Sequence, residues 1–298
     1  MIFLRATSLY TRRIAISAIF LSIALVLRLI FSWYLPLFGA NGIRVGLSPI
    51  FSMMPAILFG PVYGAIVAAL SDVLGFLLRP SGPYLPFITL AVTVGGFIRG
   101  ALWLVLRGKS SERMRIGIAV LAVFLLVFGL VNIAFLQADG IDSRFFDRVE
   151  DPQAVDVSNM HGISRLLITR SAGAANPADT LQTLLVSVTT GLIGSAAFGF
   201  VLLGADFILS KRFAKEGKES RIMPLLITVL ASGLIVSTLN TIVLRETIFR
   251  EAWQLLPFVV VWLPRVIETI VSHTVYVYFM ALLLGIFERQ QGLRELIR

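Results

Sequence analysis

The chain has no cysteine, only two histidines, and few charged side chains, which make up 14% of its 298 residues. Without cysteine no disulfide can brace an external loop, and the redox compartment cannot be inferred. His161 and His273 lack the paired spacing of metal ligands. The chain also lacks a Gly-x-Ser-x-Gly turn, a His-Glu-x-x-His helix and a Walker loop. These absences argue against an enzyme, a bound metal and any other cofactor.

Apolar residues dominate instead, at 57% of the chain, and the mean hydropathy is +0.88. A helix that crosses the hydrocarbon core needs about 20 such residues. The sequence therefore predicts an all-α, polytopic membrane bundle of about eight transmembrane helices. Five apolar windows begin near residues 14, 116, 181, 222 and 255, and three shorter or interrupted ones cover 45–59, 62–78 and 85–106. The first window is too long for a cleavable signal and contains Arg28.

Positive charge is distributed unevenly between the loops. With the N-terminus placed inside, the predicted cytoplasmic segments hold every lysine and more than half of the 26 basic residues. This bias predicts a multi-pass protein of the plasma membrane with both termini in the cytoplasm. The outward segment 137–180 is rich in aspartate. It is either a polar connector or a lid or docking element, since long ordered loops are often functional.

Several ionisable side chains lie inside predicted spans, where each costs about 2.5–3.5 kcal/mol on insertion scales. One interpretation is structural: Asp72 and Glu268 form ion pairs, and Arg28 snorkels to the interface. The other is functional: Arg28, Arg44 and Arg265 line a cavity and bind an anionic small molecule, because guanidinium groups suit carboxylates. Arg99 lies toward the inner third of its helix, where it could snorkel to the cytoplasmic face, and it is not assigned to the cavity. Stacking candidates for a flat ligand are Phe51, Tyr84, Phe87 and Trp262, with core or lipid packing as the alternative.

Small residues recur at close spacing on two predicted helices, and small residues let helix backbones approach closely in lipid. The alternatives are packing between these two helices and docking of a membrane partner. The residues concerned are Ala15, Ala18 and Ser22 on the first helix and Gly60, Gly64 and Ala68 on the third.

Three motifs together resemble the folate-type substrate-binding (S) components of energy-coupling factor (ECF) vitamin transporters. They are the segment 49–64 with its Gly-Pro-x-x-Gly, the helix carrying Asp72, and the Pro-Ser-Gly-Pro-Tyr-Leu-Pro turn at 80–86. Leu239-Asn240-Thr241 is similar too. The Asn240 amide both donates and accepts, as a pterin-like edge would require, although an interhelical hydrogen bond is the alternative.

The resemblance implies a six-helix core, formed by residues 1–106 and 222–298, with a helix pair inserted at 107–221. It implies a subunit that captures a small, anionic, folate-like vitamin from outside and works with a membrane coupling subunit and cytoplasmic ATPases. Nucleic acid is not an expected partner. Two alternatives remain open, a membrane scaffold or sensor on the same fold and an independent ion-coupled carrier.

Overall fold

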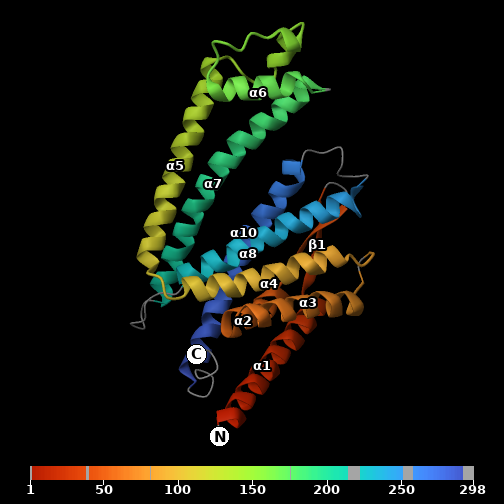
Figure 1. The fold of residues 1–298 in the computed structure, drawn as a ribbon, viewed down its shortest axis with the longest axis vertical. Helices are drawn as coiled ribbons and strands as arrows, with labels where there is room; N and C mark the ends of the chain where they lie inside the picture. Colours follow the sequence, from red (N-terminus) through yellow and green to blue (C-terminus); the bar gives the residue numbers. More distant parts are fainter. Residues whose placement is uncertain are drawn as a thin grey trace. The chain divides into compact units, whose positions relative to one another are not determined.

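The computed structural model describes residues 2–37, 40–80, 82–174, 176–213, 222–250 and 258–290 (Figure 1). These residues form two compact units. Unit 1 consists of Met1–Ser111 and Ile208–Arg298, and unit 2 consists of Glu112–Phe207. Apart from one short hairpin, the regular structure of the described residues is helical, which confirms the predicted all-α membrane bundle.

Unit 1 is a bundle in which helices from both ends of the chain pack together. Within the described residues, α3 packs against α4, α4 against α8 and α8 against α10, while α1 packs against α2 and α3. The helices are α1 (Ile2–Ile30), α2 (Ser48–Phe59), α3 (Pro61–Leu78), α4 (Pro86–Leu106), α8 (Ile222–Glu246) and α10 (Phe258–Arg289). A proline lies in the first turn of each of α2, α3 and α4, where its missing N–H costs nothing.

A single glycine joins α2 to α3. Gly60 has φ of 97°, a conformation that side-chain-bearing residues rarely adopt, and Pro61 begins the next helix directly. A Cβ added at Gly64 would lie 2.6 Å from Ala56 Cβ of α2 and 2.5 Å from the Gly96 carbonyl oxygen of α4. Gly60 therefore allows the tight turn between α2 and α3, and Gly64 allows close packing of α3 against α2 and α4.

The segment predicted as a span at 45–59 is shorter than expected. Its helix α2 has 12 residues, about 18 Å at 1.5 Å per residue, against a hydrocarbon thickness of about 30 Å. Seven of the helices in the described residues are long and apolar enough to cross a membrane. The preceding residues form an antiparallel hairpin, β1 (Ser32–Leu37) and β2 (Ala40–Gly46), which the sequence analysis did not anticipate.

Unit 2 holds α5 (Ser111–Ala138), α6 (Gly162–Ala172), most of α7 (Pro177–Phe213) and two 3-10 turns, η1 (Phe145–Arg148) and η2 (Pro152–Ala154). Close packing joins its two long helices, since a Cβ at Gly199 of α7 would lie 2.7 Å from Ala122 Cβ of α5. The described residues of segment 137–180 pack, together with the adjoining ends of α5 and α7, around a small apolar core. That core consists of Leu136, Ile141, Phe146, Leu167, Ile168 and Leu181.

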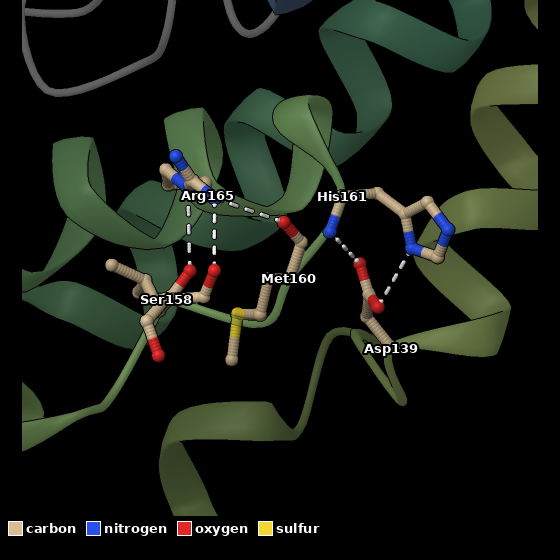
Figure 2. Close-up of polar contacts among 6 residues, drawn as sticks. Asp139, Ser158, Met160, His161 and Arg165 are labelled. Carbon is tan, nitrogen blue, oxygen red and sulfur yellow. Dashed lines mark hydrogen bonds and ion pairs between the residues drawn. The ribbon is translucent and has the colours of Figure 1, made fainter.

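Polar contacts hold parts of segment 137–180 together (Figure 2). Asp139 accepts hydrogen bonds from the backbone N–H of His161 at 2.9 Å and pairs with its ring Nδ1 at 2.8 Å. The Ser164 hydroxyl and the N–H groups of His161 hold the pKa of Asp139 below its ordinary value. Arg165 donates to the carbonyl oxygens of Val157 and Ser158. The Asp139 contacts attach the start of α6 to the end of α5, and the Arg165 bonds attach α6 to the segment that precedes it.

Candidate ligand-binding site

Unit 1 encloses a cavity of about 380 Å³, lined by residues from α1, α2, α3, α4, α8 and α10. This volume is typical of small-molecule sites. The lining runs along α4 from Ile88 to Arg99, a length of about 16 Å. Pro83 and Tyr84 at one end are exposed, whereas Arg99 and Tyr276 at the other end are buried. The cavity is therefore elongated, with an open and a closed end.

Arg28, in the last turn of α1, packs against α3 and lines the cavity. Its Nη1 donates to the Ser71 carbonyl oxygen at 2.8 Å and lies 3.8 Å from Asp72 Oδ1. The guanidinium packs directly over Gly75, where any Cβ would collide with it. The two charged side chains are 13% and 16% exposed. The absence of a side chain at Gly75 thus positions Arg28 beside Asp72.

A hydrogen-bonded chain extends from Asp72 to the open end. Thr89 Oγ1 donates to Asp72 Oδ2 at 2.8 Å, and Tyr84 Oη lies 2.8 Å from Thr89 Oγ1. Because threonine has only one hydroxyl proton, and it points to the carboxylate, the Tyr84 hydroxyl donates to Thr89. Tyr84 also packs against Phe76, with ring centroids 5.2 Å apart. The aromatic residues at the mouth are thereby tied to the charged pair inside.

Arg265, Glu268 and Asn240 complete the predicted residues that reach the cavity. Arg265 and Glu268 lie three residues apart on α10 and share a face, and both make polar contacts within the protein. Asn240 differs, because its Oδ1 is buried and has no hydrogen-bond partner among the described residues. A buried, unsatisfied acceptor costs about 1–3 kcal/mol. Asn240 is therefore suited to accept a hydrogen bond from a ligand.

The prediction that Arg99 lies outside the cavity is wrong. Arg99 lines the cavity, is only 6% exposed, and donates from Nε to Ser232 Oγ at 3.0 Å. Near it, the His273 ring packs against Gly233 of α8, where a Cβ would lie 2.5 Å from Nε2. Gly95, Gly96 and Gly100 surround Arg99 in the sequence. In the sequence, a charged residue among glycines was the signal that its side chain points into the helix bundle.

Three of the four predicted stacking residues are not among the described residues that line the cavity. Phe51 packs against Phe20, with centroids 6.3 Å apart, and Trp262 donates from Nε1 to Thr238 Oγ1 at 2.9 Å. Both positions follow from helix rotation, which turns these rings toward neighbouring helices. Phe87 is 65% exposed and also lies outside the lining. The Arg44 side chain lies outside the described part of the structure, although its backbone pairs with Tyr34 in the hairpin.

The residues predicted to dock a partner fall into two groups. Ala15, Ala18 and Ser22 are exposed on α1. Gly60 and Gly64 are buried in unit 1, and Ala68 lines the cavity. Of these six predicted docking residues, the three on α1 are therefore the ones that a partner protein can reach.

Comparison with known proteins gives two matches. Residues 12–138 match the family model described as ECF transporter, substrate-specific component. The match continues through α5, which the sequence analysis assigned to the insertion. The chain is also similar to the folate transporter FolT of Clostridium novyi (strain NT), with 33% identity over 119 residues, which cover 40% of this chain and 67% of the relative. No solved structure matches. The chain therefore belongs to the family of ECF transporter substrate-specific components.

Proposed function

We propose that this protein captures a small anionic vitamin of the folate class from outside the cell and delivers it as a subunit of an ATP-driven importer. The observation that carries this proposal is the charge of the cavity. Three arginines line it, Arg28, Arg99 and Arg265, against two carboxylates, Asp72 and Glu268. The excess of positive charge suits a ligand with one or more carboxylates. The name of the similar FolT protein supports folate as the first ligand to test.

The neutral features of the cavity fit a ligand that also has a flat polar ring. Asn240 offers a buried acceptor, and Tyr84 and Phe76 provide aromatic surface near the open end. An amino-substituted heterocycle supplies the donor that Asn240 lacks. In this arrangement Asp72 has a positioning role, because it holds Arg28 and, through Thr89, Tyr84.

We place both termini in the cytoplasm, with the open end of the cavity toward the outside, on the basis of the lysine and arginine distribution. The coupling subunit docks on the exposed face of α1 formed by Ala15, Ala18 and Ser22. Side chains this small allow the backbones of two membrane helices to approach closely. The coupling subunit and its ATPases then supply the energy for release.

Two measurements test the proposal. Purified protein in detergent should bind radiolabelled folate, and unlabelled folate should compete. Protein extracted gently from its native membrane should bring down a membrane coupling protein together with ATPases, and Ala18→Leu should abolish that co-purification without changing folate affinity. Absence of folate binding contradicts the ligand assignment. Folate binding without associated ATPases contradicts the importer role and favours a sensor, while uptake in vesicles without ATPase favours an ion-coupled carrier.

A further inference from the structure

The side chain of Arg99 differs from the other cavity arginines in its partners. Arg28 has both a carboxylate and a backbone carbonyl nearby. Arg99 has a single hydrogen bond within the described residues, from Nε to Ser232 Oγ, and no carboxylate within ion-pair distance there. A guanidinium carries five N–H donors. Its Nη edge therefore has no protein acceptor in the part of the chain that the structure describes.

A buried guanidinium group whose Nη edge has no acceptor is unfavourable unless another group accepts hydrogen bonds from it. Arg99 is 6% exposed, and an uncompensated buried charge is strongly destabilising. The surrounding helices leave little room for the side chain to turn elsewhere. A Cβ at Gly96 would lie 2.9 Å from Ala68 Cβ, and one at Gly100 would lie 2.5 Å from Pro61 Cα. The cavity is the open direction for the Nη edge.

We propose that Arg99 is the inner ligand-binding residue, and that its Nη edge binds a planar pair of hydrogen-bond acceptors on the ligand. This inference rests on the proposed function and deepens it. A carboxylate presents such a pair, as does the edge of a flat heterocycle with a carbonyl oxygen beside a ring nitrogen. The guanidinium group can donate two parallel hydrogen bonds to either acceptor pair. An ammonium group is a point charge and does not form this paired arrangement.

The position of Arg99 also fixes the direction of binding. It lies at the closed end of the cavity, about 16 Å along α4 from Ile88 near the mouth. The group that Arg99 binds therefore enters first, and the rest of the ligand lies beside Arg28, Asp72 and Asn240. The wall at this end includes His273, packed against Gly233 and 5.3 Å from the Tyr276 ring centroid.

The test compares three variants of the full chain in detergent. Arg99→Gln removes the charge and the fork, and Arg99→Lys keeps the charge alone. The matched control is Arg107→Gln, because Arg107 is exposed, follows the last residue of α4 and is not in the lining. Affinities are measured for folate, for 6-methylpterin, which has no carboxylate, and for p-aminobenzoylglutamate, which lacks the ring. Elution volume and the unfolding midpoint identify variants that do not fold.

Both Arg99 variants should bind folate about 10- to 100-fold more weakly than the wild type, as expected for loss of charge-assisted hydrogen bonds, while Arg107→Gln should not change affinity. The same loss with 6-methylpterin assigns the ring edge to Arg99. Loss with p-aminobenzoylglutamate but not with 6-methylpterin assigns the carboxylate. Wild-type affinity for all three ligands in Arg99→Gln overturns the inference.

A second probe separates this inference from the proposed function. Benzoate is a small planar carboxylate, and at millimolar concentration it should raise the melting temperature of the wild type and of Arg107→Gln but not of Arg99→Gln. If the wild type binds no folate, the proposed ligand is wrong and the benzoate result alone decides the role of Arg99. An equal benzoate effect in all variants, or none in any, overturns the assignment.

Discussion

The ion pair between Arg28 and Asp72 gives the most direct test of the cavity, because it is partly buried and its two residues come from different helices. The Nη1–Oδ1 distance is 3.8 Å, and the side chains are 13% and 16% exposed. At an effective dielectric constant of about 20 this separation gives a Coulomb energy of about 4 kcal/mol. Loss of hydration opposes it, so we expect a net coupling energy of about 2–3 kcal/mol.

A second ion pair provides the contrast. Arg148 Nη2 lies only 2.7 Å from Asp142 Oδ1, but these side chains are 57% and 58% exposed. Water screens exposed pairs, whose measured contributions are about 0.2–1 kcal/mol. Distance alone would rank this pair as the stronger, whereas burial ranks the Arg28 pair as stronger by about 1–2 kcal/mol.

Double-mutant cycles measure both energies. Arg28→Gln, Asp72→Asn and the double variant form one cycle, and Arg148→Gln, Asp142→Asn and their double variant form the other. The free energy of unfolding is obtained by denaturant titration in detergent, with each cycle referred to the transition of its own unit. A coupling energy for the Arg28 pair that is equal to or smaller than that of the Arg148 pair would refute the argument that burial sets the strength of this contact.

Three further results are expected. Gly64→Ala should lower the free energy of unfolding by about 1–3 kcal/mol, because the added methyl group meets backbone atoms. Gly117→Ala should raise the free energy of unfolding by about 0.5–1 kcal/mol, because Gly117 has open space around it and alanine favours the helix. Equal effects of the two substitutions in denaturant titrations would contradict the packing argument. Asn240→Leu should stabilise the ligand-free protein, because it removes an unsatisfied acceptor, and weaken folate binding about tenfold in the radioligand assay; lower stability with unchanged affinity would contradict this. The lowered pKa of Asp139 means that its contribution to stability is complete above the unfolded value of 3.8 and is lost as pH falls further. Proteolysis within 137–180 should therefore accelerate below about pH 4 in the wild type, and much less so in Asp139→Asn.

The sequence by itself determined the class of fold. Apolar windows of about 20 residues specify helices in a membrane because each helix satisfies its own backbone hydrogen bonds, a local property. The same local reasoning identified the ionisable Arg28 and Asp72 as residues that need a partner or a ligand, whereas Asn240 was identified from the family resemblance. The structure places all three around the cavity.

The tertiary structure decided which side chains face that cavity. Arg99 points into the cavity because α4 packs its face of small residues against α3 and α8. Trp262 points to Thr238 because α10 packs against α8. The rotation of a helix about its axis depends on packing with neighbours distant in the chain, and within a uniformly apolar helix no local pattern specifies it. The order within segment 137–180 likewise depends on Leu136 meeting Leu167 and Leu181, contacts that no short stretch of sequence contains.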